Sequence, residues 1–311
     1  MNVLFMGTPD FAEGILKVIY ECKRHTVIAV VTQPDRPKGR GKEPAMSPVK
    51  IFAKEHDIPV LQPEKIKQPE EVAKLKDIDA DIYVVAAFGQ ILSKEILDIP
   101  RYGCINVHAS LLPKYRGASP IQKAIADGED VTGVTIQQMN EGVDTGDIIS
   151  SVTLKIAPDE TGGSLFDKLA SEGASLAVRT LDDIEDGRAV RTPQNEDDAS
   201  YAGMLKKEMG CIDFNESAPA IERKIRAYTP WPGGYTYLEG RMLKIRECAA
   251  TDGVGSAAPG TVTDVSKDTI TVSCGQGRLL IKRVQAEGKK EMSVHDFLLG
   301  NSVQTGTKLG G

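Results

Sequence analysis

Residues 2–21 read NVLFMGTPDFAEGILKVIYE, and this stretch decides the fold of the N-terminal part. Its apolar run ends at Gly7, and apolar residues then recur at helical spacing. Pro9 suits the start of a helix, where the N–H group that proline lacks would have no partner anyway. The stretch therefore predicts a strand, a tight turn and a helix.

The same alternation continues along the chain. Apolar, β-branched runs predict strands, and periodic segments predict helices between them. The runs are TVIAVVTQP (26–34), DIYVVAAFG (81–89) and GCINVHAS (103–110), and the helical segments are PVKIFAKEHD (48–57) and PEEVAKLKDI (69–78). This order is typical of an α/β domain, a Rossmann-like, mostly parallel sheet with helices on both faces. Ligands of such sheets bind at the carboxyl ends of strands, which here are Gly7, Thr32–Pro34, Phe88–Gln90 and Asn106–Ser110.

Residues 33–48, QPDRPKGRGKEPAMSP, combine proline, glycine and charge without periodicity, which predicts a long exposed loop. Its glycines match neither a dinucleotide fingerprint nor a P-loop. Two interpretations stay open at this point. The segment is a plain surface loop, or it is a lid that carries basic side chains such as Arg40 to an anionic partner.

The second half of the chain predicts a domain change. Residues 133–156 indicate a β-hairpin and residues 163–186 an amphipathic helix. Periodicity is then lost in RTPQNEDDASYAGML. We expect a catalytic domain over residues 1–190, a linker over 191–205 and a second domain over 206–311.

Residues 206–311 contain one helical segment and then short strands broken by glycines, which predicts a small β-barrel of the oligonucleotide-binding (OB-like) type. The whole chain has a net charge of -6, yet residues 205–311 hold 15 Lys and Arg against 12 Asp and Glu. A basic part of this kind suits a phosphate backbone. Its small excess is also compatible with an ordinary solvated surface.

Composition narrows the class of protein. The five cysteines and four histidines are scattered without ligand spacing, so we expect reduced thiols and no metal. No run of about 18 apolar residues exists to span a membrane, and no leader pattern is present. The sequence predicts a cytoplasmic enzyme or binding protein that does not contact membranes.

Asn106 and His108 stand two residues apart on a predicted strand, so their side chains leave the same face. An asparagine amide can donate to a developing oxyanion, and a histidine can donate or accept a proton at neutral pH. The pair alone leaves a structural role open, in which both groups only hydrogen-bond neighbouring loops.

Asp144 lies in the glycine-flanked segment MNEGVDTGD, residues 139–147. Turn aspartates commonly accept hydrogen bonds from backbone N–H groups. Placed beside His108, this carboxylate would also favour the charged imidazole and fix its tautomer. The sequence contains neither a GxSxG motif nor a suitably placed cysteine, so it does not indicate a covalent nucleophile.

Two segments together, GCINVHASLLPKYRGASPIQKAI and TGVTIQQMNEGVDTGDI, resemble the folate-dependent formyltransferases, whose active sites pair Asn-x-His with a downstream aspartate. Further motifs narrow the resemblance to the methionyl-tRNA formyltransferase family over nearly the whole chain. They are FMGTPDFA, VTQPDRPKGRGK, SLLPKYRGASPI, SYAGML and RAYTPWPGGYT.

The resemblance implies specific roles. Asn106, His108 and Asp144 would be catalytic, and Arg40 would contact the aminoacylated end of a tRNA. The folate site would contain Ser110, Leu111, Leu112 and Pro113. The implied reaction moves a formyl group from 10-formyltetrahydrofolate to the α-amino group of methionine on initiator tRNA, with folate and tRNA as partners of a monomer and a tRNA-binding C-terminal domain.

Two alternatives remain at this point. One is a folate-dependent formyltransferase that acts on an amino-sugar nucleotide, because that family shares the catalytic half. The other is a non-catalytic RNA-binding module with a degenerate α/β half, against which the intact Asn106, His108 and Asp144 argue.

Overall fold

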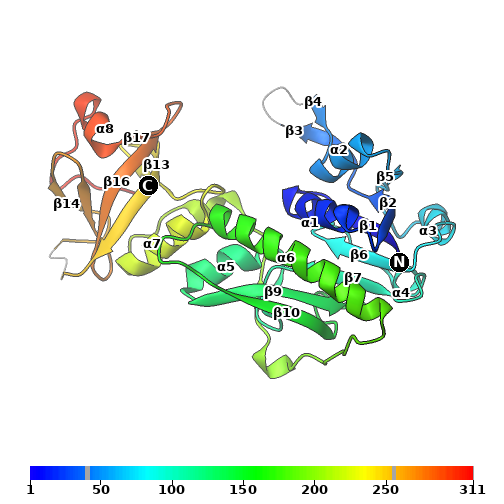
Figure 1. Ribbon diagram of the computed structural model, residues 1–311. Coiled ribbons are helices and arrows are strands. Elements are labelled where there is room, and N and C mark those ends of the chain that lie inside the picture. Colours follow the sequence, from blue (N-terminus) through cyan, green and yellow to red (C-terminus); the bar gives the residue numbers. More distant parts are fainter. Residues whose placement is uncertain (39–42, 254–256, 311) are drawn as a thin grey trace. The chain divides into compact units, whose positions relative to one another are not determined.

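The computed structural model describes residues 1–38, 43–253 and 257–310. The chain forms two compact units (Figure 1). Unit 1 comprises Met1–Pro120, Val131–Lys155 and Phe166–Ala202, and unit 2 comprises Ile121–Asp130, Ile156–Leu165 and Gly203–Gly311. No helix among the described residues is long and apolar enough to cross a membrane.

Unit 1 is built on a seven-stranded sheet in the order β10-β9-β7-β6-β1-β2-β5. The strands are β1 (Asn2–Gly7), β2 (Thr26–Val31), β5 (Val60–Leu61), β6 (Ile82–Ala86), β7 (Cys104–His108), β9 (Val131–Gln138) and β10 (Ile148–Lys155). The pairs from β5 to β7 are parallel, and β9 and β10 add two antiparallel strands at one edge. The predicted mostly parallel sheet is confirmed.

Helices cover both faces of this sheet, as its continuous apolar strands require. Their bounds are α1 (Asp10–Glu21), α2 (Pro48–Glu55), α3 (Pro69–Lys76), α4 (Lys94–Leu97) and α6 (Gly162–Glu185). On one face the rings of Phe11 in α1 and Phe166 in α6 meet edge to face at 5.6 Å. On the other face, side chains of β1, β6 and β7 share one buried cluster with those of α3 and α4.

The segment predicted to be an unstructured loop contains a short hairpin. β3 (Arg36–Lys38) and β4 (Glu43–Ala45) pair antiparallel, so the prediction of a loop over all of residues 33–48 was wrong in this part. Proline and glycine are uncommon inside strands, so their presence did not indicate pairing. Strands that do not pack on a core also need no apolar alternation, so periodicity gave no signal either.

Residues 191–202 belong to unit 1, and the boundary between the compact units falls between Ala202 and Gly203. This stretch contains the 3₁₀ turn η1 (Glu196–Asp198) and the short strand β11 (Tyr201–Ala202), which pairs in parallel with β8 (Arg116–Gly117). It is therefore part of the framework that surrounds the end of β7.

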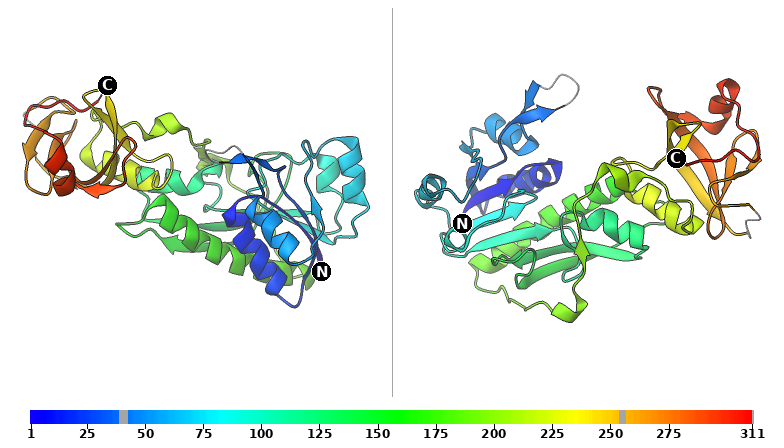
Figure 2. Two further views of the ribbon diagram at one scale, coloured as in Figure 1. Left: turned by 90° about the horizontal axis from the view of Figure 1, so that it is seen from above. Right: turned by 180° about the vertical axis from the view of Figure 1, so that it is seen from behind.

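Unit 2 contains α5 (Pro120–Asp127) from residue 121 onwards, the 3₁₀ turn η2 (Lys207–Gly210), α7 (Ala218–Ala227), α8 (Val294–Gly300) and an antiparallel sheet in the order β12-β13-β16-β15-β14, with β17 on β16 (Figure 2). Its strands are β12 (Tyr235–Leu238), β13 (Arg241–Thr251), β14 (Val262–Val265), β15 (Ile270–Ser273), β16 (Arg278–Ala286) and β17 (Met292–Ser293). Leu309 donates to the Gly260 carbonyl at 2.8 Å and Gly310 donates to the Tyr237 carbonyl at 3.0 Å. The C-terminal segment thus joins the two ends of the sheet, and the predicted small barrel is confirmed.

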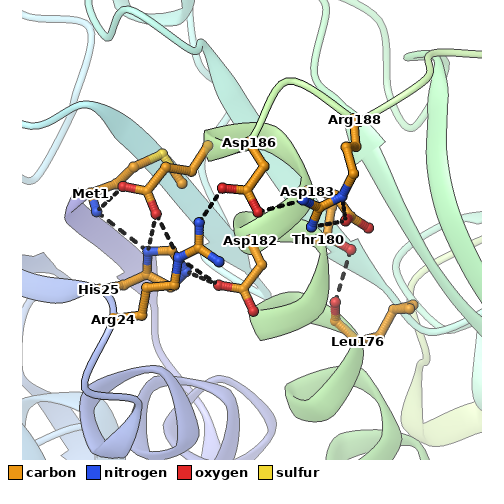
Figure 3. A network of polar contacts seen from close by, with 10 residues as sticks. Met1, Arg24, His25, Leu176, Thr180, Asp182, Asp183, Asp186 and Arg188 are labelled. Atoms are coloured by element: carbon orange, nitrogen blue, oxygen red, sulfur yellow. Dashed lines mark hydrogen bonds and ion pairs between the residues drawn. The ribbon is translucent and has the colours of Figure 1, made fainter.

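A charged network ties the start of unit 1 to the last turns of α6 (Figure 3). The His25 side chain is fully buried, with its Nε2 atom 3.0 Å from Asp182 Oδ1 and its Nδ1 atom 3.4 Å from the Met1 ammonium. Glu185 accepts from that ammonium at 3.0 Å and from Arg24 Nε at 2.9 Å. This geometry suits a neutral imidazole that donates from Nε2 and accepts at Nδ1.

Burial lowers the pKa of His25 below its ordinary value of 6.5, and the neighbouring ammonium lowers it further. The unfolded chain then binds more protons than the folded chain below pH 6.5, so stability should fall as the pH drops through that range. In urea denaturation from about pH 7.5 to about pH 5.5, the free energy of unfolding should fall by at most about 1.4 kcal/mol per pH unit.

His25→Gln should flatten this slope, whereas His295→Gln, at a histidine whose side chain is 40% exposed, should leave it unchanged. Equal slopes in the wild-type protein and in His25→Gln would contradict the assignment of the slope to His25.

Candidate active site

Asn106 and His108 are the third and the last residue of β7, which lies in the interior of the sheet between β6 and β9. Cys104 precedes them on the same face, and its Sγ atom contacts the carbonyl oxygens of Ile96 and Leu97 at the end of α4. Because side chains alternate along a strand, Asn106 and His108 also point to the α4 side of the sheet. Burial raises the pKa of the Cys104 thiol, so this cysteine is unsuited to act as a thiolate nucleophile.

Asp144 lies in the turn between β9 and β10 with φ at 53°, in the left-handed region. Its Oδ1 atom accepts from Gln137 Nε2 at 2.9 Å and from Asn106 Nδ2 at 3.3 Å. Its Oδ2 atom accepts from the backbone N–H of Gly117 at 2.8 Å. Three donors from three separate segments therefore fix the carboxylate beside β7.

The buried His108 ring is oriented by a backbone carbonyl. Its Nε2 atom lies 3.0 Å from the Tyr115 oxygen, and a carbonyl only accepts, so Nε2 carries a proton. Nδ1 then faces Asp144, with 3.6 Å between Nδ1 and Oδ1. Tyr115 has φ at 61°, an unfavourable value for a bulky residue, and this conformation turns its carbonyl toward the ring. The structure thus brings together the three side chains that were predicted to be catalytic.

The four residues predicted for the folate site follow β7 directly. Ser110 is fully buried and donates to the Lys114 carbonyl at 2.7 Å, and Leu112 is buried with its N–H bonded to Thr135 Oγ1 at 3.1 Å. Leu111 and Pro113 are half-buried. A ligand at this segment would therefore meet Leu111, Pro113 and backbone atoms rather than the Ser110 hydroxyl. Arg40, the fifth predicted binding residue, lies outside the described residues.

A cavity of about 490 Å³ opens in unit 1 on the α4 side of the sheet, near the start of β7. Met139, Asn140 and Glu141 from the β9–β10 turn line it together with residues of α4 and of the segment before β7. This volume is typical of small-molecule sites. None of the described residues predicted to be catalytic or folate-binding lines the cavity, but the turn that carries Asp144 forms part of its wall.

Sequence reasoning missed several residues that shape this site. Gln137 stands two positions after Thr135 on β9, and this period-two spacing could have placed it on the same face. The backbone groups of Tyr115 and Gly117 gave no such signal, because their roles depend on loop conformation. Gln194 was also missed, since it lies in the stretch that was predicted to be a linker.

The arrangement places an amide donor and an imidazole within hydrogen-bond or ion-pair distance of the same carboxylate. Such groups can stabilise an oxyanion and move a proton when an external nucleophile attacks a carbonyl carbon. Across the described part of the chain, no cluster of three or more His, Cys, Asp or Glu side chains has the geometry to hold a metal ion.

Comparison with known proteins places this site in a family. Residues 1–181 match the formyl transferase family, and residues 204–302 match the formyl transferase C-terminal domain. The chain is 52% identical to a methionyl-tRNA formyltransferase of Agathobacter rectalis, over 99% of each chain. It is 50% identical to that of Lachnospira eligens, over 100% of each chain.

Solved structures show the same fold at low sequence identity. An N-formyltransferase from Helicobacter canadensis, in complex with folinic acid and dTDP-3-aminofucose, has a TM-score of 0.66 at 20% identity and covers 91% of this chain and 98% of its own. The sugar 3N-formyl transferase WlaRD has a TM-score of 0.67 at 19% identity and covers 93% and 99%. Both domain matches and the full-length identities lead to one conclusion: the chain belongs to the formyl transferase family, and within it to the methionyl-tRNA formyltransferases.

Proposed function

We propose that this enzyme transfers the formyl group of 10-formyltetrahydrofolate to the α-amino group of methionyl initiator tRNA, the step that prepares this tRNA for translation initiation. The observation that carries the proposal is the convergence of Asn106, His108 and Asp144 in a chain that matches methionyl-tRNA formyltransferases along its whole length. The nucleophile is the substrate amine, which agrees with the buried, high-pKa thiol of Cys104.

In the proposed reaction the amine nitrogen attacks the formyl carbon, and the C=O bond opens into a tetrahedral intermediate with a negatively charged oxygen. The Nδ2 group of Asn106 and the Nδ1–H group of the protonated His108 ring donate hydrogen bonds to this oxygen, since His108 Nε2 already donates to the Tyr115 carbonyl. The bond from carbon to N10 of the folate then breaks, and N10 takes up a proton. The formyl group ends on the amino acid, and tetrahydrofolate leaves.

Asp144 is proposed to receive a proton that the attacking amine must lose and to pass it toward the leaving N10, directly or through water. Its fixed position supports this role, because Gln137 donates to one carboxylate oxygen and Gly117 to the other, and together they hold the group beside β7. The carboxylate also faces His108 Nδ1 and stabilises the charged ring during the reaction.

A folate donor is supported by the family and by the folinic acid bound to the Helicobacter canadensis relative. We propose that the donor binds on the α4 side of the sheet, between the turn of Asp144 and the Ser110–Pro113 segment. This placement rests on the position of these two segments at the end of β7, since the cavity near the start of the strand is lined by none of the described candidate residues.

The acceptor is proposed to be a tRNA bound by a monomer in the cytoplasm, where translation begins. Arg40 would contact the aminoacylated end, since a guanidinium suits phosphate recognition. Residues 206–311 would contact the rest of the tRNA, supported by the excess of basic residues in residues 205–311. The sugar formyltransferases share only the fold with this chain at 19–20% identity, so they do not favour an amino-sugar acceptor.

An assay with three acceptors tests the proposal. Labelled formyl transfer to methionyl initiator tRNA should exceed transfer to methionyl elongator tRNA by at least about 100-fold in kcat/KM. An amino-sugar nucleotide should remain unlabelled. Preferential labelling of the amino sugar would establish the rival formyltransferase activity, and absence of labelling with every acceptor would refute formyl transfer.

A further inference from the structure

We propose that Gln194 is a positioning residue that holds the Asp144 turn in its reactive conformation. The residue lies outside the strands and helices of the site, in a stretch that looks like a linker in the sequence. This inference rests on the proposed function, because its readout is formyl transfer.

The side-chain amide of Gln194 reaches the turn directly. Its Nε2 group donates to the Asp144 carbonyl at 2.9 Å and to the Gly146 carbonyl at 2.7 Å. Both N–H groups of the amide therefore donate to carbonyls of the same turn. The two carbonyls flank Thr145, so the contact fixes the path of the backbone on both sides of this residue.

The turn needs such support because it is conformationally costly. Asp144 has φ at 53°, a region that non-glycine residues seldom adopt. Gly146 packs so closely on β9 that an added Cβ would lie 1.7 Å from the Gln138 carbonyl oxygen. A conformation of this kind persists only where its surroundings over-determine it, and Gln194 supplies two of the contacts that do so.

The other end of the Gln194 amide is fixed by Arg116. Gln194 Oε1 accepts from Arg116 Nε at 3.0 Å and from Nη2 at 2.8 Å. Arg116 is fully buried and also binds both carboxylate oxygens of Glu196 at 2.8 Å, which raises the pKa of the guanidinium. The amide therefore cannot rotate, because a flipped amide would direct N–H groups at a guanidinium that only donates.

The same segment also supports the partner of Asp144. Ser200 Oγ accepts from the Tyr115 N–H at 2.9 Å, and the Ser200 carbonyl accepts from the Arg116 N–H at 2.8 Å. Tyr115 in turn orients His108 through its carbonyl. Residues 194–202 thus hold the backbone next to both reacting groups, with Gln194 on the Asp144 side and Ser200 on the His108 side.

Gln194→Glu gives the sharpest test, because it keeps the size of the side chain and its contact with Arg116 but removes both N–H donors. The carboxylate would also repel the two carbonyls of the turn. We expect kcat to fall by about 10- to 100-fold while KM for both substrates changes by less than about twofold. The variant should remain folded at the assay temperature, since the ion pair with Arg116 offsets part of the stability lost with the two hydrogen bonds.

Gln194→Ala should lower kcat to a similar extent, because it removes the same donors without adding charge. Asn195→Ala serves as the control. Within the described part of the chain, the Asn195 side chain accepts from the Asp197 N–H and donates to the Asp198 carboxylate, so its loss removes local hydrogen bonds of the same segment and none to the Asp144 turn. Its kcat should remain at the wild-type value. A similar loss of activity in Asn195→Ala would show a general structural effect and overturn the positioning role.

A double variant shows whether Gln194 acts through Asp144. In the background of Asp144→Asn, Gln194→Glu should slow single-turnover transfer by less than about twofold, since the group that it positions is already absent. A full additional loss in that background would overturn the proposal, as would a wild-type kcat in Gln194→Glu alone. Absence of transfer by the wild-type protein would instead refute the proposed function.

Discussion

Asp144→Asn should slow single-turnover formyl transfer by about 10²- to 10⁴-fold, the largest effect we expect from a single substitution. The asparagine keeps the shape of the side chain and can still accept from the Gly117 N–H. It removes the negative charge opposite His108 Nδ1 and the base that would receive the proton of the amine. Either loss raises the barrier of the chemical step and leaves substrate binding nearly unchanged.

The measurement is single-turnover transfer from the folate donor to methionyl initiator tRNA at saturating enzyme, with donor affinity measured separately. Asp147→Asn, in the same turn, is the matched control and should retain the wild-type rate. If Asp144→Asn transferred formyl groups within about threefold of the wild-type rate, Asp144 would be a structural turn residue and not a proton acceptor.

The sheet and the grouping of the candidate side chains at its edge could be predicted, because both depend on local sequence pattern. Residues 2–21 form a strand and a helix as predicted, and the hairpin over residues 133–156 brings Asp144 back to β7. Two residues that stand two positions apart on a strand, such as Asn106 and His108, point to the same face of the sheet in any surroundings. Such features need only the chain geometry of neighbouring residues.

The support of the site could not be predicted, because it joins residues that are far apart in the sequence. Gln194 reaches Asp144 across 50 positions, and Ser200 reaches Tyr115 across 85. No periodicity marks such contacts, and a polar stretch rich in Asp and Asn is compositionally the same whether it is solvated or bonded. The division into a catalytic domain, a linker and a tRNA-binding domain by function therefore stays a proposal, although the compact units are clear.

The composition of residues 33–48 could not predict their backbone structure. Their charge and glycine content suggested a lid that carries Arg40, but composition cannot indicate backbone pairing. The structure adds the hairpin of β3 and β4 at its base.

Asn106→Ala is the second substitution with a large expected effect, about 10²- to 10³-fold on single-turnover transfer. The residue is half-buried, and its Nδ2 group lies 3.3 Å from Asp144 Oδ1. A bond of this length is weak and leaves the amide able to turn toward a developing oxyanion. Loss of the donor therefore raises the energy of the tetrahedral intermediate more than that of the bound substrates.

His108→Ala should cost at least as much, since it removes a second donor and leaves the Tyr115 carbonyl without its ring partner. The two side chains are proposed to share one oxyanion, so their effects should not multiply. The double variant should be slower than the worse single variant by less than about tenfold. If the loss of rate in the double variant equals the product of the two single losses, Asn106 and His108 act at separate atoms. The oxygen of the formyl group would then accept a hydrogen bond from only one of them.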